Sequence, residues 1–556
     1  MFDTEEKFLA KTVISERFRA VFVASIASMA ISYVLMLTDN IVAGQFIGDD
    51  AVAAMTLVAP IMTLIFFLSY MVADGLAMMF SYAKGHNDQA KANQLFSMGV
   101  TVSIVTGATV TIILVAFQTQ ILSLWKISSE LMNYAVEYYH GLMFIALPCI
   151  LNIFFYTIYV AEGEENICVR ASIAMFVVNM VLDIALGYKI GVIGIGIATT
   201  IGNLVSFLFH VPYLFKKDCP LKFVRYWNFD ELKQGIFYSW YHSMDTLCLA
   251  LLPIIFSEYV IFKFGEDHLI VVTVINNMLT LLIAIYTGIV DCLQPMVCQY
   301  HAEGALHSVY KTMRLGINST LAVTVVAILF SFIFAQFLPG LFGVEQTETL
   351  YAESVRAVRI FMPFTIFLGA VLMFGNYYIY VERLNLGAAV KFLLLLVLPS
   401  AGMFAGHFGL QMMWVGVGIS FIVALIVTRI LTRKKCGLLL MSAKKFKQQF
   451  SCDTFTAPGQ LPALMKALKK FLSTFPIDDG RKIFLSSTVA KIFNLYAARA
   501  GICRLEVSLI PRDDSLTLIF RDNGKPVNPL EQLGTLNARE KNYMVSGDEN
   551  KLVVTF

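Results

Sequence analysis

Two aspartates in otherwise apolar stretches are the residues of this sequence best placed to do chemistry. Asp39 stands in LMLTDNIVAG and Asp183 in VVNMVLDIAL, where Asn179 precedes it by one helical turn. Residues four apart share one face of a helix, so this amide and this carboxylate point the same way. Two carboxylates and an amide at one depth would form an oxygen-lined cation site, or the two acids would share a proton.

The apolar surroundings make these acids costly. A carboxylate in hydrocarbon costs roughly 2.5–3.5 kcal/mol even on the lenient insertion scale, so each one needs a partner or a water-filled cavity. The alternative is that Asp39 and Asp183 merely cap or pin the ends of helices. We favour a functional role for the pair, because acidic residues inside a membrane usually mark a functional site.

Three further acids interrupt apolar stretches later in the chain. Asp245 and Asp291 are expected to pair with each other or to contact a cationic substrate, and alternatively to line a water-filled vestibule. Glu258 is a candidate for a second ion-binding acid. Asp74 stands near a helix end, where we expect it to be solvated, and His242 is expected to lie at a membrane interface.

The composition indicates that a bilayer surrounds most of the chain. Its 556 residues are 58% hydrophobic, and the mean hydropathy is +0.70. Charged residues make up 15%, where a soluble domain carries about 25%. A net charge of +3 is too small to indicate nucleic-acid binding. The nine cysteines show no metal-ligand spacing, so we expect no zinc site and no disulfide framework.

Windows of about 20 apolar residues, the length that crosses a bilayer, divide the chain into two sets of six spans. Lysine and arginine gather on one side of these spans, which predicts that both termini lie in the cytoplasm. We expect a multi-pass protein of the plasma (inner) membrane. The predicted fold is an all-α polytopic protein of twelve transmembrane helices. The predicted spans are residues 18–46, 51–82, 95–118, 133–160, 167–188 and 191–214, then 236–264, 268–300, 315–338, 352–380, 386–408 and 411–433.

The two halves resemble each other in sequence. YTIYVAEGEENICVR (156–170) is similar to YYIYVERLNLGAAVK (377–391), and MMFSYAKGHNDQAKAN (78–93) is similar to MVCQYHAEGALHSVYK (296–311). Any two amphipathic loop ends can look alike, but both matches occupy equivalent places in their halves. The halves therefore predict a parallel repeat, which builds two six-helix lobes around a central cavity.

The composition changes after the last span. Alternating runs such as RLEVSLI (504–510) and SLTLIF (515–520) predict strands, so we expect a small cytoplasmic α+β domain. The predicted division is an N-terminal lobe at 1–215, a cytoplasmic linker at 216–235, a C-terminal lobe at 236–433, a basic juxtamembrane linker at 434–455 and the small domain at 456–556.

Two segments carry a family resemblance. LTDNIVAGQFIGDDAVAAMTLVAP (37–60) and FVVNMVLDIALGYKIGVIGIGIATTIGN (176–203) resemble the MATE family, the multidrug and toxin extrusion transporters. The matching elements are an aspartate late in span one, a glycine-rich turn into span two, an N-x-x-x-D in span five and a glycine-rich entry to span six. The resemblance covers about residues 15–433.

This resemblance implies a secondary active exporter that works by alternating access. It assigns ion coupling to Asp39, Asn179 and Asp183, with Thr199 and Thr200 as neighbours. The expected cargo is a cationic or amphiphilic organic solute such as a drug, and the expected coupling ion is Na⁺ or H⁺. We expect a monomer that needs no cofactor and binds no nucleic acid.

The C-terminal domain weakly resembles the GHKL-type ATPase fold of histidine kinases. RDNGKPVNPLEQLG (521–534) is similar to the nucleotide turn of that fold, with Asp522 and Gly524 at matching positions, and Asn494 matches its Mg²⁺-binding asparagine. Ala490 stands where an acidic residue is expected, so we do not expect catalysis. ATP binding alone is one interpretation, and a degenerate structural or regulatory domain is the favoured one.

Two other functions fit the sequence less well. A lipid-linked oligosaccharide flippase needs basic side chains in its cavity, whereas these spans carry acids and few bases, with Lys391 an exception. A membrane-anchored sensor acting through its C-terminal domain is the alternative outside transport.

Overall fold

The computed structural model describes residues 12–123, 129–217, 219–341, 349–433, 437–498, 503–512, 515–526, 528–531, 538–546 and 549–556. Residues 434–436, which begin the predicted juxtamembrane linker, lie outside these ranges. The described chain is mostly helical, and its strands are confined to the C-terminal region. Both features confirm the predicted fold class.

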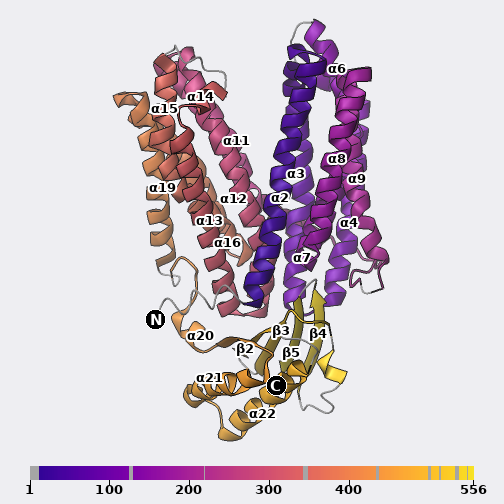
Figure 1. Cartoon of the computed structure of the whole chain (residues 1–556), viewed down its shortest axis with the longest axis vertical. Coiled ribbons are helices and arrows are strands. Elements are labelled where there is room, and N and C mark those ends of the chain that lie inside the picture. Colours follow the sequence, from indigo (N-terminus) through magenta and orange to yellow (C-terminus); the bar gives the residue numbers. More distant parts are fainter. Residues whose placement is uncertain are drawn as a thin grey trace.

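The described residues of the first lobe form the helices α2 to α9, most of which are labelled in Figure 1. A bend of 53° separates Leu131–Leu142 from Ala146–Glu162, which together cover the predicted fourth span. The helices are α2 (Val13–Phe46), α3 (Asp49–Gly85), α4 (Gln89–Ala116), α5 (Gln118–Leu122), α6 (Ser129–Leu142), α7 (Ala146–Glu162), α8 (Glu165–Ile190) and α9 (Val192–His210).

The second lobe follows the same plan. The described residues hold 11 helices that are long and apolar enough to cross a membrane, or up to 12 if the bent pair counts as one span. This agrees with the predicted twelve. The helices of the second lobe are α10 (Phe229–His242), α11 (Met244–Phe264), α12 (Leu269–Glu303), α13 (Leu306–Phe334), α14 (Leu338–Leu341), α15 (Thr349–Phe361), α16 (Thr365–Tyr380), α17 (Leu384–Phe392), α18 (Leu398–Gly402) and α19 (Leu410–Arg433).

The second lobe begins earlier than predicted. Helix α10 starts at Phe229, inside the stretch 216–235 that was expected to be a linker. Asn228 caps it, since its side chain accepts the backbone N–H groups of Asp230 (3.0 Å) and Glu231 (3.3 Å). Capping and acidic residues in the first turn both stabilise a helix start. The last polar residues of this stretch, from Asp230 onward, therefore belong to the first turns of a helix.

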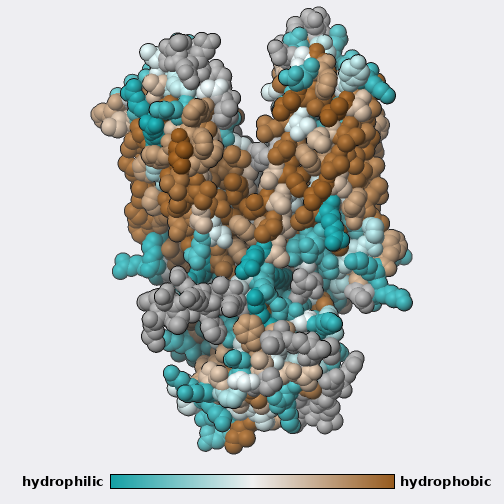
Figure 2. Space-filling model, in the orientation of Figure 1, coloured by the Kyte–Doolittle hydropathy of each residue, from teal (hydrophilic) through white to brown (hydrophobic). Residues whose placement is uncertain are grey.

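The lobes pack together at the end next to the C-terminal domain, which we call the domain-side end, and diverge at the other end (Figure 1). The space-filling view shows an open cleft between two largely apolar arms (Figure 2). At the domain-side end, the Gly75 N–H donates to Ser239 Oγ (2.7 Å). A Cβ on Gly75 would lie only 1.8 Å from the Gly235 carbonyl oxygen. The backbones of α3 and α10 therefore touch, which closes the cleft on this side.

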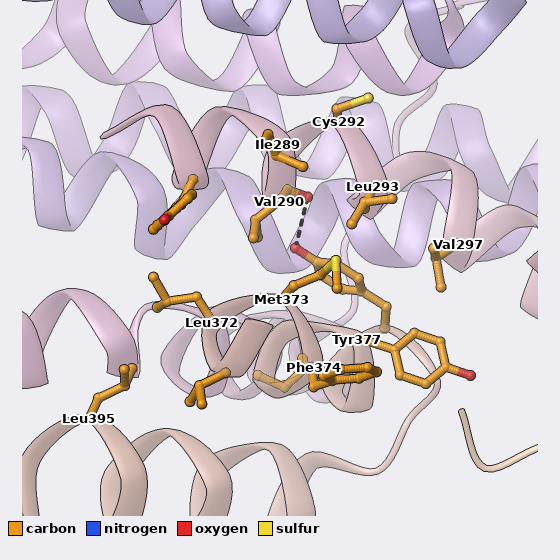
Figure 3. Close-up of a cluster of buried hydrophobic side chains, with 14 of the residues drawn as sticks. Ile289, Val290, Cys292, Leu293, Val297, Leu372, Met373, Phe374, Tyr377 and Leu395 are labelled. Carbon is orange, nitrogen blue, oxygen red and sulfur yellow. Dashed lines mark hydrogen bonds between the residues drawn. The ribbon is translucent and has the colours of Figure 1, made fainter. Parts of the chain in front are cut away.

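Apolar packing between α12 and α16 holds the second lobe together (Figure 3). Val290 and Leu293 of α12 share a buried cluster with Leu372 and Met373 of α16. The Tyr380 hydroxyl crosses between the helices and donates to the Val290 carbonyl (3.2 Å). Lipid tails are as apolar as these side chains, so close packing and such hydrogen bonds are what hold the helices to one another.

The C-terminal domain is a five-stranded antiparallel sheet with two helices on one face. Strand order is β1-β2-β3-β5-β4, and α21 (Leu461–Thr474) and α22 (Asp479–Ala497) pack on its core. The short helix α20 (Ala443–Lys447) precedes it. The strands are β1 (Phe450–Phe455), β2 (Arg504–Arg512), β3 (Ser515–Asp522), β4 (Glu540–Ser546) and β5 (Glu549–Thr555).

One strand lies where a linker was predicted. Strand β1 falls inside the stretch 434–455, and it pairs with β2 from Phe450 opposite Leu509 to Phe455 opposite Arg504. The sequence shows no alternation strong enough to identify an edge strand whose partner residues are 49 to 59 positions away. Strand β1 forms because the unpaired backbone N–H and C=O groups at the edge of β2 bond to it.

Replacing Gly75 by alanine should destabilise the closed end of the cleft. The added Cβ would force α3 and α10 apart, and overpacking of this kind costs about 1–3 kcal/mol. We expect a lower thermal unfolding midpoint in detergent. Gly44→Ala is the matched control, since its Cβ would meet nothing closer than Val52 Cγ2 at 3.6 Å. Equal midpoints for the two variants would contradict the close approach.

Candidate functional site

Three helices of the first lobe, α2, α8 and α9, hold the candidate site. Gly191 joins α8 to α9 with φ +74°, a left-handed conformation that favours glycine and lets α9 turn back along α8. Further along, a Cβ on Gly202 would lie 3.2 Å from Asn179 Cβ. Small residues at these two positions therefore let α9 approach α8 closely, beside the predicted acids.

Asp39, Asn179, Asp183 and Thr199 lie together in this packing. With its amide oriented so that both of its atoms are satisfied, Asn179 donates to Asp39 Oδ1 (3.3 Å) and to Asp183 Oδ2 (2.8 Å). Its oxygen accepts the Thr199 N–H (3.2 Å). Exposed fractions are 7% for Asp39, 1% for Asn179 and 0% for Asp183. One amide thus bridges two buried carboxylates on different helices.

The two threonines differ in where they point. Thr199 Oγ1 lies 3.4 Å from the Asn179 amide. Thr200 Oγ1 instead donates to the carbonyls of Gly141 (2.9 Å) and Gly196 (3.0 Å), which ties α9 to α6. Neighbours on a helix point to different faces, so Thr200 is a packing contact, and we leave it out of the site.

The site brings two acidic groups together in an apolar setting. Asp183 Oδ1 is buried and has no hydrogen-bond partner among the described residues. Two adjacent carboxylates repel each other when both are ionised, so a bound cation or a shared proton would stabilise them. Tyr138 of α6 lies near enough to interact electrostatically with both acids. Sequence reasoning missed Tyr138, because nothing in its local sequence distinguishes it from other span tyrosines.

The second lobe contains a buried ion pair that the sequence did not reveal. Lys391 Nζ lies 3.2 Å from Asp245 Oδ2, and Asn376 Nδ2 donates to the same oxygen (3.0 Å). Lys391 also donates to the backbone carbonyls of Tyr241 and His242. Asp245 was expected to pair with Asp291 or to contact substrate. Its partner is Lys391, because α17 and α11 pack side by side.

A histidine links the two lobes near the closed end of the cleft. His242 Nδ1 lies 3.0 Å from Asp74 Oδ2, and His242 Nε2 lies 3.0 Å from the Tyr380 hydroxyl. Both Asp74 and His242 are buried. The expectations of a solvated Asp74 and an interfacial His242 were wrong, because each supplies the partner that the other needs. Asp291 is half-buried and interacts electrostatically with both of them and with Asp245.

The remaining predicted residues lie apart from these clusters. Glu258 is exposed on α11, and Asn494 is exposed on α22. Asp522 is fully buried, and its Oδ1 accepts the Gly524 N–H (3.0 Å) and the Asn550 side-chain N–H (3.0 Å). That carboxylate therefore fastens the turn after β3 to β5. Nucleotide binding by Asn494, Asp522 and Gly524 stays a prediction.

Comparison with known proteins identifies the family. The family model described as MatE matches residues 24–185 and 244–400, one range in each lobe. The chain belongs to the MatE family. Two matches in one chain are what the predicted repeat of two halves requires, and MatE membership makes the two lobes a multi-pass membrane transporter.

Relatives and solved structures agree with this family. The "Probable multidrug resistance protein YoeA" of Bacillus subtilis (strain 168) is 23% identical over 353 residues, which cover 60% of this chain and 73% of the relative. The "Multidrug export protein MepA" of Staphylococcus haemolyticus (strain JCSC1435) is 26% identical over 202 residues, or 35% of this chain and 44% of that protein.

Among solved structures, one described as the outward-facing conformation of a multidrug resistance MATE family transporter of the MOP superfamily has a TM-score of 0.71 at 20% identity. It covers 78% of this chain and 98% of that chain. A MOP superfamily transporter from Pyrococcus furiosus, described as having a binding pocket of reverse polarity, has a TM-score of 0.70 at 20% identity. Likeness at this identity shows that the MatE chain shares their fold.

Asn179→Ala should abolish the stabilisation that a cation or proton bound between Asp39 and Asp183 would give the chain. A ligand at 100 times its Kd stabilises a protein by about 2.7 kcal/mol, so ion binding is visible as a shift in the unfolding midpoint between NaCl and choline chloride, or between two pH values. Asn203→Ala is the control, since this buried amide on α9 donates only to the Thr199 carbonyl (3.0 Å) among the described residues. A full ion-dependent shift in Asn179→Ala would contradict the prediction.

Lys391→Met should unfold at a lower temperature than the unaltered chain. It leaves Asp245, whose side chain is 18% exposed, without its ion-pair partner, and removing one member of a buried pair costs at most about 3–5 kcal/mol. Adding Asp245→Asn should recover part of the loss. Lys263→Met, which removes an exposed lysine on α11, should change little. If the double variant is no more stable than Lys391→Met alone, the two charges are not coupled.

Proposed function

We propose that this MatE chain exports organic solutes in exchange for Na⁺ or H⁺. The observation that carries the proposal is the buried Asp39–Asn179–Asp183 cluster in the first lobe. Two adjacent carboxyl groups in hydrocarbon need a partner to be stable. A small cation or a proton is a partner that can bind and dissociate during transport. Ion occupancy would then alter the relative stability of two arrangements of the lobes.

The open cleft supports alternating access. It faces away from the C-terminal domain, and the domain-side end is closed by glycine contacts and by the His242–Asp74 pair. The sequence predicts both termini on the cytoplasmic side of the plasma membrane. In that orientation the cleft opens to the outside of the cell. An ion that binds one arrangement about 10⁴-fold more tightly moves the balance from 1:99 to 99:1, so coupling needs only a difference in affinity.

The cargo we propose is a cationic or amphiphilic compound. The relatives described as multidrug resistance and multidrug export proteins support this class. The half-buried carboxylate of Asp291, near the closed end of the cleft, supplies a negative charge in keeping with a cation. Lys391 is neutralised by Asp245, which weakens the alternative of a lipid-linked oligosaccharide whose pyrophosphate needs free bases.

Efflux from proteoliposomes under an imposed Na⁺ or pH gradient tests this function. A fluorescent cationic dye would leave the vesicles only when the matching gradient is present. Asp39→Asn and Asp183→Asn should each slow gradient-driven efflux by about tenfold or more, because hydrogen bonds to charged groups contribute about 1.5–3 kcal/mol.

The control for this test is Asp267→Asn, an exposed acid in the turn between α11 and α12, which should keep full efflux. If Asp39→Asn and Asp183→Asn both retain gradient-driven efflux, the coupling site lies elsewhere. If neither gradient drives efflux of any cationic dye by the unaltered chain, the proposed class of cargo or coupling is wrong.

A further inference from the structure

The sheet of the C-terminal domain uses its two faces differently. Alternate residues of a strand point to opposite faces. One set packs under α21 and α22, and the other set faces the ends of the membrane helices (Figure 1). The second set is charged, yet Glu506, Arg521, Glu549 and Lys551 are all at most 3% exposed. Buried charges of this number must be paired by what lies across the interface.

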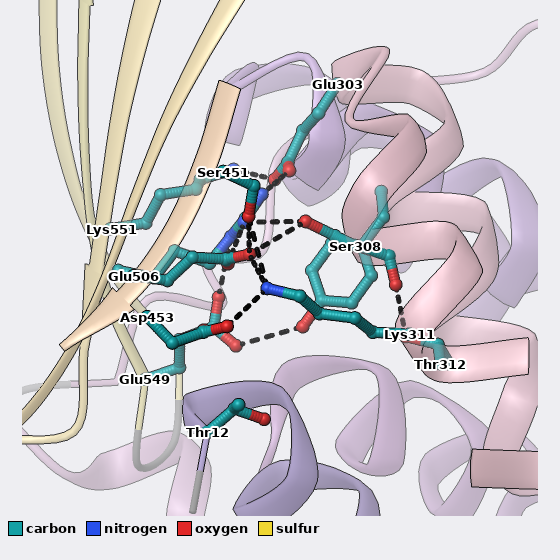
Figure 4. Close-up of polar contacts among 12 residues, drawn as sticks. Thr12, Glu303, Ser308, Lys311, Thr312, Ser451, Asp453, Glu506, Glu549 and Lys551 are labelled. Atoms are coloured by element: carbon teal, nitrogen blue, oxygen red, sulfur yellow. Dashed lines mark hydrogen bonds and ion pairs between the residues drawn. The ribbon is translucent and has the colours of Figure 1, made fainter. Parts of the chain in front are cut away.

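The second lobe supplies most of the paired charges (Figure 4). Glu303, at the end of α12, pairs with Arg521 and with Lys551, the latter at 2.8 Å. Lys311 of α13 pairs with Asp453 of β1 at 2.7 Å. These contacts join β1, β3 and β5 to two helices of the second lobe, and removing one member would leave a buried charge without its partner.

Glu506 lies at the centre of this network. It accepts from Lys311 Nζ (3.2 Å), from Arg521 Nη1 (2.6 Å) and from the Ser308 hydroxyl (3.3 Å). Burial by itself would raise the pKa of Glu506, but the charges of Lys311 and Arg521 and their hydrogen bonds lower it to about 2. Glu506 is therefore ionised throughout the physiological pH range, and it keeps its ion pair with Lys311 of the second lobe over that range.

Backbone and apolar contacts add to this attachment. Gln449 donates to the Gly304 carbonyl (2.8 Å) and accepts the Leu306 N–H (2.9 Å). A small apolar cluster spans the same junction, and the chain itself enters the domain from α19 of this lobe. The cluster consists of Ala305, Ile510, Ile519 and Val553. The domain is therefore a fixed part of the second lobe.

The first lobe makes fewer and weaker contacts with the same sheet. Three side chains of β4 and β5 donate to backbone carbonyls, and hydrogen bonds to such uncharged acceptors contribute modestly. The carbonyls belong to the ends of α3 and α7 and to the turn after α3. The bonds are Asn542 Nδ2 to Asn87 O (3.0 Å), Ser546 Oγ to Glu162 O (2.5 Å) and Lys551 Nζ to Lys84 O (3.0 Å).

The seam with the first lobe is also loosely packed. Two ion pairs cross it, Arg17 with Glu549 at 3.1 Å and the partly exposed Glu16 with Arg504. A cavity of about 370 Å³ lies along it, lined among others by Arg17, Glu16, Glu549 and Gly524. A junction with fewer ion pairs and hydrogen bonds, beside a cavity, separates at lower cost than the denser network on the second lobe.

We propose that the C-terminal domain is a clamp that holds the two lobes together at the domain-side end, staying on the second lobe and releasing the first when the cleft opens toward it. The turns that it grips, Lys84–Gly85 and Glu303–Gly304, occupy equivalent places in the two halves. Opening of the cleft at this end must separate these turns, so the first-lobe contacts must break. The clamp therefore favours the arrangement that is open on the far side.

A buried cysteine reports opening at the domain-side end. Cys298 of α12 is fully buried, and the neighbouring Gln299 carbonyl lies 2.4 Å from where a Cβ on Gly85 would stand. The lobes must part on this side before a maleimide can reach it. With the other eight cysteines replaced by serine or alanine, the rate of Cys298 labelling in the full chain measures that opening without any transport assay.

Removing contacts between the C-terminal domain and the first lobe should speed labelling of Cys298. The clamp variant combines Arg504→Gln, Asn542→Ala and Ser546→Ala, which touch the first lobe from the domain. We expect labelling to rise by about tenfold or more, since three bonds are lost. The matched control combines Arg481→Gln, Asn494→Ala and Ser473→Ala on the exposed surface of α21 and α22, and it should label at the original rate.

A cross-link gives the opposite change. A short bis-maleimide joining Glu16→Cys to Arg504→Cys should nearly stop labelling of Cys298, whereas one joining Leu306→Cys to Gln449→Cys, on the second lobe, should leave it unchanged. Labelling of the clamp variant at the control rate would overturn the proposal, and so would slowing by the second-lobe cross-link alone. Neither readout needs an ion gradient or a cargo, so failure of the proposed export function would leave this test intact.

Discussion

The cost of a carboxylate in hydrocarbon is the constraint on which the first lobe depends. Asp39 and Asp183 are buried from water on two different helices, and Asn179 is the group that reaches both. That contact requires α2, α8 and α9 to lie close together at one depth. The left-handed turn at Gly191 and the close approach at Gly202 meet this requirement. The packing of these three helices thus holds two carboxyl groups beside each other.

A second set of polar contacts determines which end of the cleft is closed. His242 and Asp74 satisfy each other across the lobe interface, and the glycine contact between α3 and α10 places their helices within reach. The Asp245–Lys391 pair stabilises the second lobe on the same side. The polar groups at the lobe interface are paired with one another only while this end is closed. Opening must therefore replace these pairs with contacts to water or to a ligand.

The C-terminal domain lies outside both ranges that match the MatE family, yet it is not an independent appendage. Its charged sheet face is covered by the lobes, with more ion pairs to the second lobe than to the first, where hydrogen bonds to backbone carbonyls add to two ion pairs. An interface divided in this way couples the domain to the relative position of the lobes. A sensor with a separate output domain would instead leave that face free to meet a partner.

The sequence by itself determined the number and approximate bounds of the spans, the two halves, the small α+β domain and the Asn179–Asp183 face. These follow from hydropathy and helical spacing, which are local properties. It did not determine that α10 begins at Phe229, that β1 forms from a stretch that looks like a linker, or that Thr200 faces α6. Nor did it reveal the Asp245–Lys391 and Asp74–His242 pairs or the charged interface around Glu506. Only the tertiary structure decided these, because each depends on a partner far away in the sequence, on a helix cap, or on the rotation of a helix about its own axis.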